Sequence, residues 1–177
     1  EVLQLMNMHD ATLDQAAYLR VIRSKTAKLF EASSRLAAVL ASAPAPLEDA
    51  CAEYGLSLGT AFQVIDDVLD YDGDAAEMGK NLGDDLREGK ATLPLILAMK
   101  LGTPEEAQVV RQAIETGSTT ELPRIVDIVR LTGALERTRV AAAAQAERAV
   151  AAARALPTNE FTNSLIELAA QLLQRRS

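Results

Sequence analysis

Residues 62–70 decide the expected fold and chemistry of this chain, and they read Phe62-Gln63-Val64-Ile65-Asp66-Asp67-Val68-Leu69-Asp70. At about 100° per residue in a helix, Gln63 and the three aspartates share one side, while the apolar residues take the other. Carboxylates one and four residues apart repel each other, and the repulsion grows in a partly dry site unless a cation lies between them. Mg2+ prefers oxygen ligands and commonly binds together with phosphate. The stretch therefore predicts a helix that packs on its apolar side and binds a metal ion and phosphate on the other.

The composition indicates an all-helical protein. The chain has 177 residues, of which 49% are hydrophobic and 24% charged, enough for one domain with a core. Aromatic residues make up only 3% and tryptophan is absent, so the core must consist mainly of Ala, Leu, Val and Ile. That mixture favours helices, and no segment shows a clear strand pattern. We therefore predict an all-α fold.

Charge and cysteine content narrow the expected partners and location. The net charge of −7 argues against nucleic acid as a partner. No run of about 18 apolar residues occurs, so we expect no membrane span, and no secretory signal is visible. The single cysteine, Cys51, cannot form an internal disulfide, which fits a reducing cytoplasm.

Helical periodicity runs through most of the chain. We predict helices at about 12–41, 46–71, 93–101, 104–116, 120–131, 134–155 and 158–174. Two of these begin with the spelling of a capping box, at Thr12-Leu13-Asp14-Gln15 and at Thr103-Pro104-Glu105-Glu106. Residues 72–92 lose the period and are rich in glycine and charge. This predicts an irregular loop directly after the aspartates.

Basic residues around the acidic helix could supply the positive charge that a phosphate site needs. Lys80 and Lys90 each follow a glycine, so flexible backbone lies beside both cations. Lys25 lies in the middle of a helix among apolar residues. Its ammonium group could extend outward to solvent or point into a cavity, and the pattern alone leaves both orientations open.

Gly55 and Gly59 lie four residues apart and share one face of the acidic helix. A face without side chains allows another helix or a ligand to approach closely. Helix–helix packing is the simpler of these two interpretations.

Three motifs together resemble those of the trans-prenyltransferases, or polyprenyl diphosphate synthases, and most closely those of the bacterial octaprenyl diphosphate synthase branch. The motifs are Lys25-Thr26, Phe62-Gln63-x-x-Asp66-Asp67-x-x-Asp70 and Gly79-Lys80-Asn81-x-Gly83-x-Asp85-Leu86-x-x-Gly89-Lys90-x-Thr92-Leu93-Pro94. The resemblance extends over essentially the whole chain, because Glu1-x-x-Gln4 is similar to the Gly-Glu-x-x-Gln helix of the family.

The resemblance implies a helical bundle around a deep central cavity, a homodimer, and a reaction that joins isopentenyl diphosphate to an allylic prenyl diphosphate. The expected product is a long-chain trans-polyprenyl diphosphate, a precursor of quinone side chains. By resemblance, Asp66, Asp67 and Asp70 form the second of two aspartate-rich motifs and bind Mg2+, with Asp66 and Asp70 as the direct ligands.

The resemblance also assigns roles to the other motif residues. Lys25 and Lys80 would contact the allylic diphosphate, with Lys90 as a weaker candidate. Thr26 and Gln63 would direct their oxygens at the allylic carbon and, like the lysines, bind substrate. Neutral oxygens can stabilise an allylic cation without forming a covalent bond to it.

The chain also departs from the family pattern. The first aspartate-rich motif and the isopentenyl diphosphate site would precede Glu1. We therefore predict that residues 1–177 are the C-terminal portion of a single all-helical synthase domain, inactive alone, and that product length cannot be predicted from them. Two alternatives are a class I isoprenoid cyclase, which the Gly-Lys-x-Thr-Leu-Pro tail disfavours, and a non-catalytic subunit, which would not need the aspartates.

Overall fold

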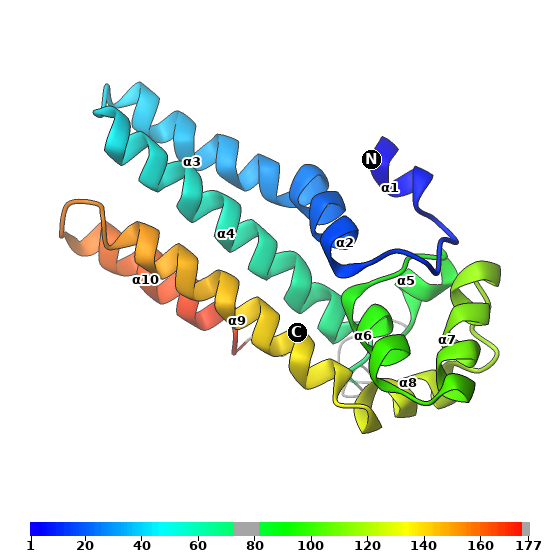
Figure 1. The fold of residues 1–177 in the computed structure, drawn as a ribbon. Coiled ribbons are helices and arrows are strands. Elements are labelled where there is room, and N and C mark those ends of the chain that lie inside the picture. The colour runs from blue at the N-terminus through cyan, green and yellow to red at the C-terminus, as the bar shows by residue number, and fades with distance from the viewer. Residues whose placement is uncertain (73–81, 175–177) are drawn as a thin grey trace. The chain divides into compact units, whose positions relative to one another are not determined.

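The structure is a computed structural model that describes residues 1–72 and 82–174. The described residues contain ten α-helices and one π-helical segment, and no strand occurs among them (Figure 1). In chain order the elements are α1 (Val2–Met6), α2 (Gln15–Ile22), η1 (Arg23–Ala27), α3 (Lys28–Leu40), α4 (Ala45–Leu69), α5 (Asp84–Arg87), α6 (Leu93–Leu101), α7 (Pro104–Thr116), α8 (Leu122–Leu131), α9 (Ala134–Ala153) and α10 (Glu160–Leu172). The predicted all-α class is confirmed.

The predicted helices are present, with two differences. The single helix expected at 12–41 is divided into α2, η1 and α3, because the backbone widens into a π-helical turn at Arg23–Ala27. The short helix α5 lies inside the stretch that was expected to be irregular. Elements this short contain too few residues for a periodic sequence pattern to reveal them.

One of the two predicted capping boxes is confirmed and the other is wrong. Thr103 and Glu106 exchange both capping hydrogen bonds at the start of α7. At α2 the helix begins at Gln15, and Asp14 caps it by accepting the Ala17 N–H at 2.7 Å. Thr12 is not the cap because it lies three residues before the first helical residue, and its hydroxyl donates to Asp10.

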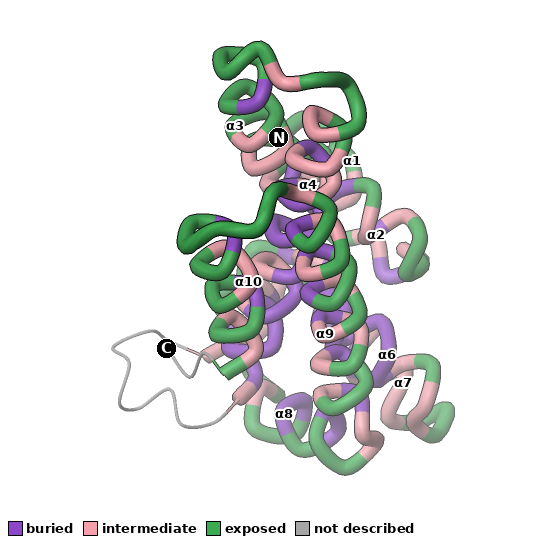
Figure 2. The backbone as a smooth tube through the Cα atoms, turned by 90° about the vertical axis from the view of Figure 1, so that its left-hand side faces the viewer, coloured by how far each residue is buried: buried purple, intermediate pink, exposed green. Residues whose placement is uncertain are grey.

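The fold divides into two compact units, each with its own core. Among the described residues, unit 1 holds Glu1–Val21 and Asp66–Val140, and unit 2 holds Ile22–Ile65 and the chain from Ala141 onward. The centre of unit 1 is α6, whose residues Leu93–Ala98 are all buried (Figure 2). A helix that is apolar on every side can be stable only when other elements surround it.

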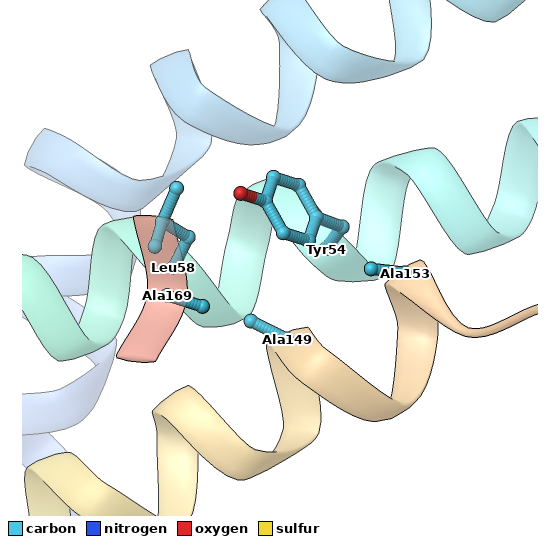
Figure 3. Packing of buried hydrophobic residues seen from close by; sticks show 5 residues of the cluster. All are labelled: Tyr54, Leu58, Ala149, Ala153 and Ala169. Carbon is cyan, nitrogen blue, oxygen red and sulfur yellow. The ribbon is translucent and has the colours of Figure 1, made fainter. Parts of the chain in front are cut away.

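Unit 2 packs α4 against α9 and α10 through small side chains. Its core cluster consists of Tyr54, Leu58, Ala149, Ala153 and Ala169 (Figure 3). The small alanine side chains let the helix backbones approach closely. The large Tyr54 ring fills the space that the alanines leave between the helices. No helix in the described ranges is long and apolar enough to cross a membrane.

The glycine face of α4 packs on another helix, as the simpler interpretation predicted. A Cβ added at Gly55 would lie 2.4 Å from the backbone oxygen of Phe30 in α3. One added at Gly59 would lie 2.8 Å from the Cα of Ala27 in η1. Both glycines are therefore required because no side chain fits between α4 and the preceding helices.

Candidate active site

The C-terminal end of α4 presents the three aspartates in unit 1. Asp66 and Asp67 belong to the last turn, and Asp70 directly follows it, with its N–H donating to the Asp66 carbonyl at 3.3 Å. Asp66 and Asp70 are half-buried, whereas Asp67 is only 3% exposed. A buried carboxylate needs hydrogen-bond donors, because its charge has lost the stabilising water.

Tyr18 of α2 supplies such a donor to Asp67. The Tyr18 hydroxyl donates to Asp67 Oδ2 at 2.6 Å, and the tyrosine itself is buried. Burial of Tyr18, followed by the charge of Asp67, raises the pKa of the phenol well above its usual range. The phenol therefore keeps its proton and remains a hydrogen-bond donor to the carboxylate.

Backbone N–H groups supply the donors to Asp70. Its Oδ1 accepts from the N–H of Asp84 and its Oδ2 from the N–H of Asp85, both at 3.2 Å. These two residues open α5, and Gly83 before them has a φ of 76°, a conformation that side chains other than glycine rarely adopt. The glycine thus turns the chain so that the first N–H groups of α5 meet the Asp70 carboxylate.

The carboxyl of Asp70 lies in a site that favours its neutral form. Burial, followed by the nearby charge of Asp85, raises the pKa of Asp70 to about 6, although the N–H groups of Asp85 and Asp84 oppose the shift. A bound cation would offset the effect of the neighbouring negative charge and favour the carboxylate. The electrostatics at this end of α4 therefore suit a cationic ligand.

Lys90 is already paired within the acidic loop. Its Nζ lies 2.8 Å from Asp85 Oδ1 and 2.7 Å from Glu88 Oε2. Burial alone would lower the pKa of Lys90, but the hydrogen bonds to Asp85 and Glu88 outweigh it and raise the pKa. The ammonium group of Lys90 therefore pairs with the carboxylate of Asp85, and the backbone N–H of Asp85 donates to the Asp70 carboxylate. Lys80, the other predicted cation of this loop, lies outside the described residues.

In unit 2 the structure brings Thr26 and Gln63 together. Thr26 lies in the π-helical turn η1, and its hydroxyl donates to Gln63 Oε1 of α4 at 2.9 Å. Lys25 lies beside Thr26 in the same turn and is exposed. Isolated π-helical turns are frequent at functional sites, where the extra residue redirects side chains.

Unit 2 also contains an apolar groove of about 480 Å3. Phe30 and Phe62 contribute to its lining, and their ring centroids are 5.7 Å apart. Phe62 precedes Gln63, and Phe30 follows Thr26 by about one helical turn. The remaining lining residues are Leu58, Leu168, Gln171, Leu172 and Gln174. The groove is thus a mainly apolar surface, and Thr26 and Gln63 are not among the residues that line it.

The donor set at the aspartates fits a metal that shares its coordination with another ligand. In the part of the chain that the structure describes, no group of three or more His, Cys, Asp and Glu side chains is arranged to hold a metal ion. Asp67 is engaged by Tyr18. Mg2+ is usually held by one or two carboxylates together with phosphate oxygens and water, which Asp66 and Asp70 could provide. The assignment of all three aspartates as metal ligands stays a prediction.

Two residues of this arrangement were missed by the sequence analysis. Tyr18 could have been suspected, because a tyrosine on an apolar helix face usually needs a partner for its hydroxyl. Asp85 was counted as part of the motif but was given no role, since nothing in the spacing shows that its backbone binds Asp70.

Comparison with known proteins identifies the family. The model of the polyprenyl synthetase family matches residues 1–130. The chain belongs to the polyprenyl synthetase family. It is 48% identical to octaprenyl diphosphate synthase of Escherichia coli over 99% of its own length and 54% of that protein. It is 41% identical to the all-trans-nonaprenyl-diphosphate synthase (geranyl-diphosphate specific) of Rhodobacter capsulatus, over 99% of this chain and 54% of the relative.

Solved structures of the polyprenyl synthetase family share the fold. The polyprenyl synthase of Caulobacter crescentus, in complex with calcium and isoprenyl diphosphate, is 46% identical and superposes with a TM-score of 0.92. This match covers 99% of the present chain and 54% of the Caulobacter chain. The chain thus spans about half the length of the relatives that it matches.

Proposed function

We propose that this chain is the C-terminal portion of a single-domain, Mg2+-dependent prenyltransferase that condenses isopentenyl diphosphate with an allylic prenyl diphosphate. The product would be a long-chain trans-polyprenyl diphosphate, a quinone side-chain precursor. Family membership supports this class of reaction. The observation that carries the proposal is the end of α4, which bears Asp66 and Asp70 and where the N–H groups of Asp84 and Asp85 fix the Asp70 carboxylate at 3.2 Å. A divalent cation bridging to a diphosphate would suit this site.

The proposed binding roles follow the chemistry of the side chains. Asp66 and Asp70 would hold Mg2+, and the Tyr18 hydrogen bond would hold the Asp67 carboxyl group in place. Lys25 and Lys80 would contact the allylic diphosphate. Lys90 would act mainly by pairing with Asp85, whose N–H donates to the Asp70 carboxylate. The calcium and isoprenyl diphosphate bound to the Caulobacter relative support this ligand class.

The proposed reaction begins when the carbon–oxygen bond of the allylic diphosphate breaks. Mg2+, when bound, would stabilise the negative charge that develops on the leaving diphosphate. Thr26 donates its hydroxyl hydrogen to Gln63, so a lone pair of Thr26 Oγ1 would be left to face the allylic cation. The apolar groove lined by Phe30 and Phe62 would hold hydrocarbon.

Further parts of the proposal concern the whole enzyme. The first aspartate-rich motif and the isopentenyl diphosphate site would lie on a part of the enzyme that this chain does not contain, so the chain would be inactive alone. The intact enzyme would be a cytoplasmic homodimer. The relatives are chain-elongating synthases by name, which supports elongation over cyclisation.

Binding of inorganic pyrophosphate tests the proposal. Isothermal titration of the chain should show pyrophosphate binding that requires Mg2+. The double variant D66A/D70A should lose this binding, because neither carboxylate remains to hold the metal. The matched control is D127A, which removes an exposed aspartate of α8 in the same unit.

The control separates local coordination from general charge. Both variants reduce the negative charge of unit 1, but only D66A/D70A removes the proposed ligands. Equal pyrophosphate affinity in D66A/D70A and D127A would contradict the proposed function, as would binding that is independent of Mg2+.

A further inference from the structure

The only histidine of the chain, His9, packs on the turn that precedes Lys90. It lies between α1 and α2, and its backbone N–H donates to the carbonyl of Gly89 at 2.8 Å. Its imidazole Nδ1 lies 3.1 Å from the carbonyl oxygen of Ile114 in α7. His9 thus joins the segment after α1 both to the end of the acidic loop and to α7, all within unit 1.

The contact with Ile114 determines which nitrogen of the His9 ring carries a proton. A carbonyl oxygen can only accept a hydrogen bond, so Nδ1 must be the donor here. His9 as a whole is exposed, but the edge of its ring with Nδ1 and Cε1 faces the protein. The ring is therefore oriented by residues far from it in the sequence.

The backbone of Gly89 lies directly against the His9 ring. A Cβ added at Gly89 would lie 2.3 Å from Nδ1 and 2.4 Å from Cε1 of His9. Gly89 also has a φ of 72°, which side chains disfavour. Glycine is therefore required at position 89 for two reasons, the shape of the turn and the space that the ring occupies.

His9 itself adopts an uncommon backbone conformation. Its φ is 62°, a value that residues other than glycine rarely have, although histidine and asparagine adopt it more often than most. Such a conformation costs free energy and persists only where the surrounding contacts enforce it. The hydrogen bonds of His9 to Gly89 and Ile114 are the contacts that do so here.

The turn under the His9 ring sets the position of Lys90. The N–H of Lys90 donates to the carbonyl of Asp85 at 2.9 Å, and its ammonium group lies 2.8 Å from the Asp85 carboxylate. The N–H of Asp85 donates in turn to Asp70 Oδ2 at 3.2 Å. A continuous series of contacts therefore connects His9, through Gly89 and Lys90, to the carboxylate of Asp70.

We propose that His9 is a positioning residue for the candidate metal and diphosphate site. By holding the backbone of Gly89, it keeps Lys90 on Asp85 and thereby keeps the Asp85 N–H on the Asp70 carboxylate. The effect of His9 on metal and diphosphate binding rests on the proposed function, whereas its effect on the turn does not.

Two substitutions of His9 separate the ring contact from the backbone strain. H9A removes the ring and leaves an alanine at positive φ. H9N tolerates this φ, and its amide nitrogen is as many bonds from Cα as Nδ1, so it can donate to the Ile114 carbonyl in place of the ring. The matched control is S42A, because Ser42 is the other non-glycine residue with positive φ in the described ranges, at 52°. Ser42 is exposed and belongs to unit 2.

Amide hydrogen exchange of Lys90 measures the turn directly. H9A should speed this exchange about fivefold, the size expected for loss of one hydrogen bond. H9N should stay within about twofold of the parent chain, and S42A should leave the exchange unchanged. The amide of Ile125 in α8, which donates to the Glu121 carbonyl, serves as the internal reference for global stability.

Three results of this experiment would overturn the role of His9 in the turn. The first is unchanged exchange of Lys90 in H9A. The second is exchange in H9N or S42A that is as fast as in H9A. The third is an equal acceleration at Ile125, because a general loss of stability would affect both amides alike.

The Mg2+-dependent affinity for pyrophosphate, measured by isothermal titration, tests the connection to the site. H9A should weaken it about fivefold, whereas H9N and S42A should bind like the parent chain. Parent-like affinity in H9A would overturn the positioning role. If the parent chain itself binds no pyrophosphate, the proposed function fails, and the exchange of Lys90 alone then decides whether His9 holds the turn.

Discussion

The aspartates at the end of α4 are stabilised by two different kinds of donor. Asp67 accepts a phenol hydrogen from Tyr18 inside unit 1. Asp70 accepts two backbone N–H groups from the start of α5. A hydrogen bond to a carboxylate contributes more to the free energy of unfolding than one between neutral groups. Removing the Tyr18 hydroxyl should therefore lower the stability of the chain markedly.

Y18F should destabilise the chain by about 1.5–3 kcal/mol, because a buried carboxylate loses its donor. Urea unfolding at neutral pH measures the change. Y54F is the matched control, since Tyr54 donates to a neutral carbonyl, that of Leu165. Its expected cost is about 0.5–1.5 kcal/mol. Equal losses in the two variants would show that the charge of Asp67 adds nothing.

At the scale of the element, α4 is defined by the partner packed on each of its faces. Its glycine face contacts η1 and α3 through Gly59 and Gly55. Its Tyr54 and Leu58 face the alanines of α9 and α10 (Figure 3). Small residues on both sides set the spacing of these helices, so added volume should be costly.

G55A should destabilise the chain by about 1–3 kcal/mol, because the new methyl group would overlap the backbone of α3. The overlapping atom is the Phe30 carbonyl oxygen, which would lie 2.4 Å from the alanine Cβ. G102A is the control, since its nearest neighbours lie at 3.0 Å and include the flexible Glu106 side chain. Thermal unfolding should show a larger decrease for G55A than for G102A, and the reverse order would contradict the packing argument.

Alkaline pH should weaken the contact between α4 and α10. Burial raises the pKa of Tyr54 to about 12, whereas a tyrosine in the unfolded chain has a pKa of about 10. The contribution of Tyr54 to stability is therefore complete below about pH 10 and is lost as the pH rises through about 12, because the unfolded state releases its proton first. Urea unfolding at about pH 9 and about pH 11 should show a smaller decline for Y54F than for the parent chain. An identical decline would contradict the prediction.

Local signals explain which parts of the fold could be predicted from sequence. The start of α7 is marked by Thr103-Pro104 and a capping box within four residues, and its position was predicted correctly. The π-helical turn η1 could not be predicted, since five residues carry no distinct period. The pairing of Thr26 with Gln63 joins residues 37 apart in sequence, and only the family resemblance brought them together. The contacts of Tyr18 and Asp85 depend on tertiary structure, and periodicity cannot show them.

At the scale of the whole molecule, the chain matches only about half of each relative. It carries one aspartate-rich stretch, at the end of α4. The proposed condensation needs two diphosphates held at once, so that the double bond of one can reach the allylic carbon of the other. Binding of one diphosphate and turnover should therefore be separable in this chain.

The purified chain should bind Mg2+ and pyrophosphate but should form no longer prenyl diphosphate from isopentenyl diphosphate and farnesyl diphosphate. The physical reason is that an unbound isopentenyl diphosphate loses the gain in effective concentration that positioning provides, which can reach about 10⁵ M or more. Chromatography of the radiolabelled products measures the outcome, with octaprenyl diphosphate synthase of Escherichia coli as the positive control. D66A/D70A serves as the blank for residual activity. Elongated product from the parent chain above this blank would show that one aspartate-rich motif suffices for the reaction.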